Sequence, residues 1–126
     1  MDSSKSPHGL IGEAYRPTKI GSKGAVVANH TMATQAGMRI LHRGGNAVDA
    51  AIAVAFALGA AEPQGSSIGG DGFVMVHMAA NGTVEVANGT GAAPLAATAD
   101  KYKDGIPYTG ILGTSVPGIV DALLSA

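Results

Sequence analysis

The sequence predicts a fold of the α+β class, or a layered α/β arrangement, and three observations carry this prediction. A nearly continuous apolar helix is expected over residues 47–60, where Asp49 is the one charged residue. Beyond Pro63 the hydrophobic period changes from that of a helix to that of strands. Two strand-like runs, 73–78 and 83–87, then flank an Asn-Gly pair, the strongest short-range hairpin signal. Helices that are separate from an antiparallel hairpin are typical of this class.

Before the central helix, the sequence indicates a lead-in, one strand and one helix. Residues 1–22 lack apolar periodicity, so we expect an extended or disordered segment. Residues 24–29 form a short apolar run that is typical of a buried strand. Thr31 is the expected N-cap of the following helix, and Gly37 on its apolar face predicts close approach to the central helix. The residues of that face are Ala33, Ala36, Gly37, Ile40 and Leu41.

The central helix has clear start and stop signals. Gly44-Gly45 can supply the left-handed residue that closes the preceding helix. Asn46 then stands at the N-cap, and Asp49 at the third helical position suits the helix dipole. The helix has no polar stripe, so we expect it to be buried on every side. It is shorter than the roughly 20 apolar residues that span a bilayer, which makes it a core helix.

After the hairpin, the sequence predicts short helices joined by turns. Pro94 opens a segment that is expected to be helical over 97–103, and Lys103 to Pro107 form a turn. A last helix begins near Gly118 and stops without a C-cap signal. The chain is 46% hydrophobic and 13% charged, which resembles a protein interior. We therefore expect it to be a piece of a larger protein.

Charge and composition exclude several classes of function. The formal net charge of −1 provides no electrostatic footprint for nucleic acid or an acidic membrane surface. The absence of cysteine excludes disulfides, thiolate catalysis and cysteine-based zinc sites. The first ten residues contain no apolar stretch of the kind found in a secretory signal, so a cytoplasmic location is expected.

The residues taken alone do not assemble a catalytic set. The glycine-rich loop 65–72 could cradle a phosphate, but it lacks a Gly-Lys-Ser/Thr ending and precedes a strand where a dinucleotide fingerprint precedes a helix. We expect its glycines to serve close backbone packing instead. Ser66, Ser67 and Ser115 lack a nucleophile-elbow context. The four histidines, which have no metal-ligand spacing, are His8, His30, His42 and His77.

Several segments together closely resemble one family, the γ-glutamyltransferase (glutathione hydrolase) family of N-terminal-nucleophile hydrolases. The match runs from about Gly24 to Leu124, and GGNAVDAA followed by GGDGF at this separation is highly specific. The segments that carry the resemblance are Thr34–Gly37, Ile40-Leu41, Gly44–Ala51, Pro63, Gly69–Phe73 and Val116–Gly118.

The resemblance implies a four-layered αββα sandwich of the Ntn-hydrolase type, made as a proenzyme that cleaves itself. The new N-terminal Thr of the small subunit is then nucleophile and, through its α-amine, general base. That Thr lies beyond residue 126, so this chain contributes no catalytic residue. Residues 23–126 resemble the N-terminal part of the large subunit. The implied partners are the rest of that subunit, the small subunit and a small-molecule substrate; no metal or organic cofactor is implied.

The predicted substrate-binding residues are Asn88, Gly89 and Thr90. In glutamyl-transferring members of the family, an Arg four residues before the Pro aligned with Pro94 grips the substrate α-carboxylate. Thr90 stands there, and a Thr cannot form a bidentate charge-assisted pair. Some amidohydrolases and acylases of the superfamily carry an Arg two residues before this Pro, where this chain has Ala92.

Three functions therefore stay open. The first is γ-glutamyl transfer or hydrolysis, and the second is amide hydrolysis on small substrates that lack a glutamyl group. The third is a catalytically inactive structural fragment. A nucleotide-binding module is disfavoured by the spacing of the glycine-rich loop.

Overall fold

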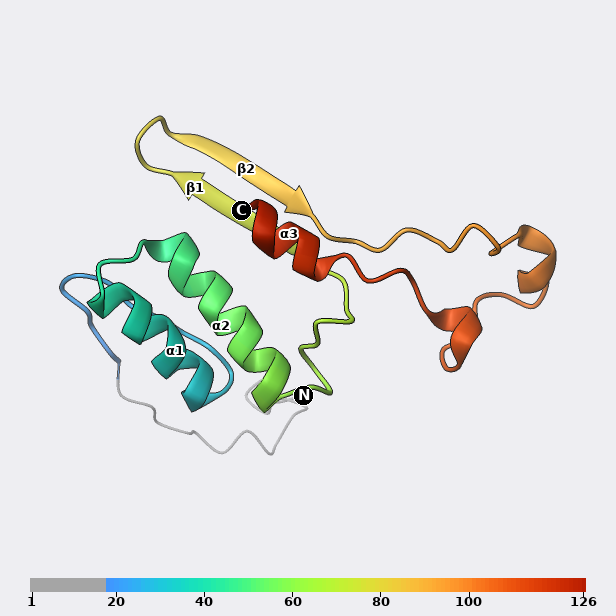
Figure 1. The fold of residues 1–126 in the computed structure, drawn as a ribbon, viewed down its shortest axis with the longest axis horizontal. Coiled ribbons are helices and arrows are strands. Elements are labelled where there is room, and N and C mark those ends of the chain that lie inside the picture. Colours follow the sequence, from blue (N-terminus) through green and yellow to red (C-terminus); the bar gives the residue numbers. More distant parts are fainter. Residues whose placement is uncertain (1–17) are drawn as a thin grey trace, which may run out of the picture.

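The computed structural model describes residues 18–126 and has an α+β fold, with three α-helices and one two-stranded antiparallel sheet. In Figure 1 the first two helices lie side by side, and the hairpin and the last helix lie together beyond them. The elements are α1 (Thr31–His42), α2 (Ala47–Ala61), β1 (Phe73–Met78), β2 (Thr83–Asn88), the 3₁₀ turns η1 (Ala99–Tyr102) and η2 (Ile111–Gly113), and α3 (Ile119–Ser125).

The turn between α1 and α2 follows the sequence prediction. Gly44 has a φ of 91°, the left-handed conformation that ends α1. Asn46 Oδ1 accepts hydrogen bonds from the amides of Val48 and Asp49, at 2.7 and 2.9 Å. Asp49 Oδ2 in turn accepts from the amide of Asn46 at 2.9 Å, which completes a capping box.

The N-cap of α1 is His30, so the prediction of Thr31 was wrong by one residue. His30 Nδ1 accepts from the amide of Met32 at 3.2 Å, and Thr31 is already helical. An imidazole nitrogen can satisfy a free helix amide in the same way as a hydroxyl oxygen.

Small side chains allow α1 and α2 to pack closely. A Cβ added to Gly37 would lie 2.7 Å from Val54 Cγ2 and 2.9 Å from Val26 Cγ1. Ala33 on α1 and Ala50 on α2 are both buried. The close approach predicted at Gly37 is thus confirmed.

The hairpin pairs Phe73 with Asn88 at its open end and Met78 with Thr83 at the turn. Gly82 adopts a φ of 71° in the turn. Asn81 Oδ1 accepts from the Thr83 amide at 3.0 Å, which fixes the start of β2. Helix α3 packs against both strands and buries Ala122 and Leu123.

Residues 92–115, which we call the arm, extend away from the rest of the chain (Figure 1). The helix predicted over 97–103 was wrong: the arm contains only the short 3₁₀ turns η1 and η2. The side chains of Leu95 and Tyr108 are fully exposed, so residues 18–126 provide no packing surface that would stabilise a longer helix there.

Two predictions of burial differ from the structure. Helix α2 buries only Ala50 fully, and Phe56 is 37% exposed, so residues 18–126 cover the helix only in part. The run 24–29 has no strand partner among these residues, and Val27 is 93% exposed. Both segments need apolar or hydrogen-bonding partners that the described residues do not supply.

The predicted lead-in lies mostly outside the described residues, which begin at Thr18; residues 18–22 are exposed and irregular. Within the described part of the chain, none of the helices has the length and apolarity needed to cross a membrane.

Candidate functional site

Three segments of the predicted family motifs meet at the open end of the hairpin. They are residues 70–72 before β1, residues 89–92 after β2, and residues 115–118 before α3. The amides and carbonyls of Gly72 and Gly89 form reciprocal hydrogen bonds of 3.3 and 2.8 Å, which extend the ladder by one pair. The amide of Ile119 donates to Gly70 O at 3.2 Å, so α3 starts against the same point. We call this meeting point the junction.

Glycines allow the three backbones of the junction to touch. Gly89 is buried, and a Cβ added there would lie 2.8 Å from Ala122 Cβ and 2.9 Å from the carbonyl oxygens of both Gly118 and Gly72. A Cβ added to Gly118 would lie 2.6 Å from Gly89 O. These glycines therefore serve close approach, as expected for the loop before β1.

Asp71 joins the other two segments through its side chain. Its Oδ1 accepts from the amide of Gly91 at 3.0 Å, and its Oδ2 accepts from Ser115 Oγ at 2.7 Å. Sequence reasoning missed this role of both residues, because the partners are 20 and 44 residues away from Asp71. No local pattern around Asp71 signals this role, because the amides of the adjacent Gly70 and Gly72 bond Ser67 O and Gly89 O instead.

The predicted substrate-binding residues all lie at the junction. Asn88 and Thr90 are exposed, and Asn88 Oδ1 accepts from the Thr90 amide at 2.9 Å. Gly89 is buried, with its amide and carbonyl both bonded to Gly72, so its backbone fixes the position of its neighbours. Binding of a substrate by these three residues stays a prediction.

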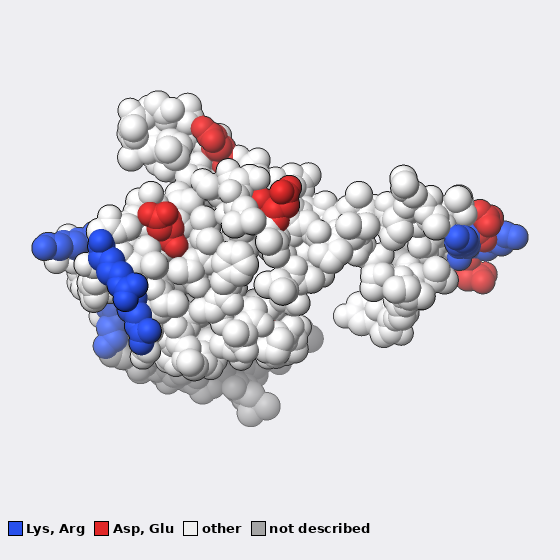
Figure 2. Space-filling view, viewed as in Figure 1, with Lys and Arg blue, Asp and Glu red and all other residues white. Residues whose placement is uncertain are grey.

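The stretch of sequence around Thr90 supplies no cation. No Lys or Arg occurs between Arg43 and Lys101, whereas Asp71 and Glu85 fall within that stretch. In Figure 2, blue groups lie at the two ends of the visible face, and the coloured groups over the hairpin and α3 are acidic. Thr90 thus offers a hydroxyl, a neutral hydrogen-bonding group, where a carboxylate would need a cation for strong binding.

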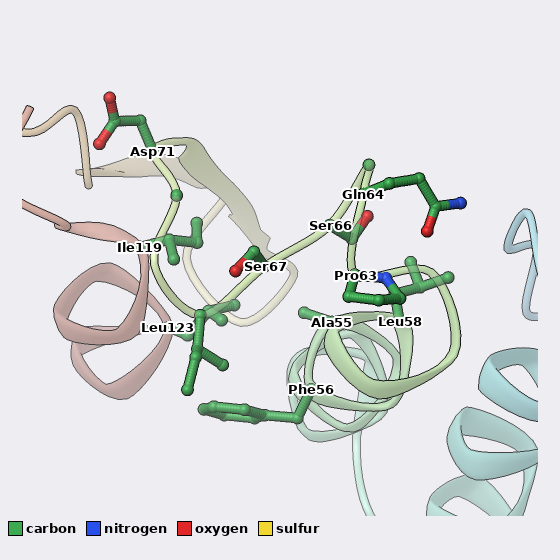
Figure 3. Close-up of a pocket in the computed structure, with 13 residues that line it drawn as sticks. Ala55, Phe56, Leu58, Pro63, Gln64, Ser66, Ser67, Asp71, Ile119 and Leu123 are labelled. Atoms are coloured by element: carbon green, nitrogen blue, oxygen red, sulfur yellow. The ribbon is translucent and has the colours of Figure 1, made fainter. Parts of the chain in front are cut away.

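A hollow of about 450 Å³ lies beside the junction, between α2, the loop that follows it and α3. Phe56, Ile119 and Leu123 surround it in Figure 3, and the Asp71 carboxylate points away from it. A second hollow, of about 300 Å³, separates α2 from β1. Apolar side chains dominate both hollows, so they resemble gaps between packing layers more than polar binding sites.

The glycine-rich loop and two of the histidines, which the sequence offered as other candidate sites, take part in local structure. In the loop 65–72, amides donate to oxygens of the chain itself, so they do not converge on an anion; these amides are Gly65, Ser66, Gly69, Gly70 and Gly72. His30 caps α1, His42 ends it, and His77 is exposed on β1. His8 lies outside the described residues. Among residues 18–126, no three potential metal ligands cluster.

A comparison with known protein families supports the family resemblance that these motifs indicate. A family model described as gamma-glutamyltranspeptidase matches residues 33–126, which include the whole junction. The chain belongs to the γ-glutamyltranspeptidase family. The resemblance found in the sequence is thereby confirmed.

Relatives within the γ-glutamyltranspeptidase family include proteins with different names. The glutathione hydrolase-like YwrD proenzyme of Bacillus subtilis is 43% identical over 106 residues, covering 82% of this chain and 20% of the relative. The acylase ACY 1 proenzyme of Pseudomonas sp. (strain V22) is 47% identical over 83 residues, covering 66% of this chain and 15% of that protein.

Among solved structures, the γ-glutamyltranspeptidase of Helicobacter pylori superposes with a TM-score of 0.78 at 35% identity. The match covers 86% of this chain and 33% of that structure. This chain therefore spans 15–33% of the length of these family members.

Proposed function

We propose that this chain is the N-terminal part of the large subunit of a γ-glutamyltranspeptidase-type proenzyme that hydrolyses or transfers γ-glutamyl amides. The observation that carries the proposal is the junction, where segments around Gly72, Gly89 and Gly118 touch within a continuous family match over 33–126. Proteins named glutathione hydrolase proenzymes, such as that of Escherichia coli at 36% identity, support the same reaction class.

In the proposed whole protein, residues 23–126 form one part of a four-layered αββα domain, preceded by the lead-in 1–22. The uncovered apolar residues support this, because Phe73 and Met75 on β1 are 66% and 73% exposed. The rest of the large subunit and the small subunit would cover these side chains and α2. A cytoplasmic location stays a prediction from the sequence, which fractionation of cells expressing the full-length protein would test.

The proposed chemistry resides in a Thr of the small subunit, outside these 126 residues. Its α-amine takes the proton of its hydroxyl, and Oγ attacks the substrate carbonyl. The amide C–N bond breaks, the amine leaves with the proton, and an acyl-enzyme ester remains. Water or the amine of an amino acid then attacks this ester and frees the Thr. The role of this chain is to supply one wall of the acyl pocket at Asn88, Gly89 and Thr90, and no cofactor enters the proposal.

A second candidate is an amidohydrolase that acts on small acyl groups without the glutamyl α-amino-acid head. The specific observation in its favour is the neutral Thr90 together with the lack of Lys and Arg between residues 43 and 101. A charged hydrogen bond contributes about 1.5–3 kcal/mol, so an absent Arg lowers discrimination for glutamyl groups by roughly ten- to a hundredfold. The relative named acylase supports this candidate.

The experiment is expression of the full-length protein, followed by two measurements. We expect self-cleavage into two chains, seen by mass spectrometry as a small subunit that begins with Thr. The processed protein is then assayed on a γ-glutamyl anilide and on a matched acyl anilide without the α-amino and α-carboxylate groups. Faster turnover of the first supports glutamyl transfer, and faster turnover of the second supports the amidohydrolase. An unprocessed protein inactive on both would overturn the proposal.

A further inference from the structure

We propose that Asp71 is a positioning residue, which holds the loop 88–91 so that the Thr90 side chain meets the substrate at a fixed place. This inference rests on the proposed function, because it takes the loop as a wall of the acyl pocket. The carboxylate accepts from the loop at Gly91 N and from the segment before α3 at Ser115 Oγ. One side chain thus connects two segments on either side of the arm.

The contacts around Thr90 indicate why its place depends on Asp71. On its N-terminal side, Gly89 is fixed by two backbone bonds to Gly72. On its C-terminal side, the amide of Gly91 is bonded to the Asp71 carboxylate at 3.0 Å. Between them, the Thr90 amide is held by Asn88, and its side chain is exposed. Removing the carboxylate takes away the bonds at Gly91 and Ser115 and leaves the bond from Val116 N to Ala92 O, so the loop loosens between Thr90 and Ala92.

The chemistry of the two partners predicts which substitutions preserve the arrangement. A backbone amide can only donate, whereas a serine hydroxyl can donate or accept. Asn at position 71 could therefore accept from Gly91 and donate to Ser115 with the same shape. Ala at position 71 provides neither bond. Ala at position 115 removes one bond and leaves the bond to Gly91.

The experiment compares Asp71→Ala, Asp71→Asn and Ser115→Ala in the processed full-length enzyme, on whichever chromogenic amide the wild type hydrolyses. We expect Asp71→Ala to raise KM about tenfold, which corresponds to about 1.4 kcal/mol, with kcat changed less than about twofold. Freeing the backbone of about one residue has an effect of this order. We expect Asp71→Asn to stay within about threefold of the wild-type KM, and Ser115→Ala to lie between the two.

Asp49→Ala is the matched control, since Asp49 is also an exposed carboxylate that bonds a backbone amide, but within the capping box of α2. We expect it to lower stability and leave KM unchanged. A fraction of misfolded enzyme lowers the maximal rate without altering KM, so a purely structural role of Asp71 would give the pattern of the control. An unchanged KM in Asp71→Ala refutes the inference.

Hydrogen exchange gives a readout that does not depend on activity. In Asp71→Ala, we expect amide exchange to quicken about tenfold in a peptide covering residues 88–92, with a peptide from α2 unchanged. If the wild type hydrolyses no amide, the proposed function fails, and this exchange still tests the positioning. Equal exchange in the variant and the wild type overturns it.

Discussion

Gly89→Ala tests the close backbone contact on which the junction depends. The added Cβ would lie 2.8 Å from Ala122 Cβ and 2.9 Å from two carbonyl oxygens, whereas carbon atoms prefer about 3.5–4.0 Å between them. None of these atoms belongs to the far end of a flexible side chain, so whole segments must move apart. Such overpacking costs about 1–3 kcal/mol, and weakening the two Gly72–Gly89 hydrogen bonds adds about 0.5–1.5 kcal/mol each. We expect a loss of about 2–6 kcal/mol.

The assay for Gly89→Ala is urea unfolding of the full-length protein, monitored by circular dichroism. Gly65→Ala is the matched control, because a Cβ at Gly65 meets nothing within 4 Å and its φ is not positive. We expect that control to stay near the wild type or to gain about 0.4–1 kcal/mol from the stiffer unfolded chain. Equal stability of Gly89→Ala and Gly65→Ala would show that the three backbones do not touch as described.

The remaining predictions concern substrate choice, burial and catalysis. Thr90→Arg in the full-length enzyme should raise kcat/KM on a γ-glutamyl anilide by roughly ten- to a hundredfold, because it adds a charged partner for the α-carboxylate; no gain would remove Thr90 as a determinant of specificity. Ala50→Glu places a charge at a residue 3% exposed and should cost several kcal/mol in urea unfolding, and Ala57→Glu should do so if the rest of the protein covers α2. The isolated 126-residue chain should release no chromophore from either anilide, and robust release by the purified chain would contradict the downstream nucleophile.

Local signals in the sequence were sufficient for the elements whose contacts are also local. The capping box joins Asn46 and Asp49, which are three positions apart, Gly44 needs only its own φ, and the hairpin turns at the predicted Asn-Gly pair. These features depend on backbone amides within a few positions, so composition and spacing determine them.

Contacts between distant segments could not be predicted in the same way. Asp71 and Ser115 are 44 residues apart, and no periodicity relates them. The run 24–29 has the composition of a strand, but a strand exists only with a partner, which residues 18–126 do not provide. The site residues were placed through the family resemblance, and the apolar pattern alone would not have found them.

The arm has a consequence for how such a protein can vary. Its two ends are tied together by the bond from Val116 N to Ala92 O, at 3.0 Å, and by Asp71. The tie does not involve the residues between them, so insertions or deletions near Tyr108 leave it intact. Doubling the length of a closed loop costs only about 0.6 kcal/mol in chain entropy. The base of the arm can therefore stay constant while the length and sequence of the chain between its two ends vary.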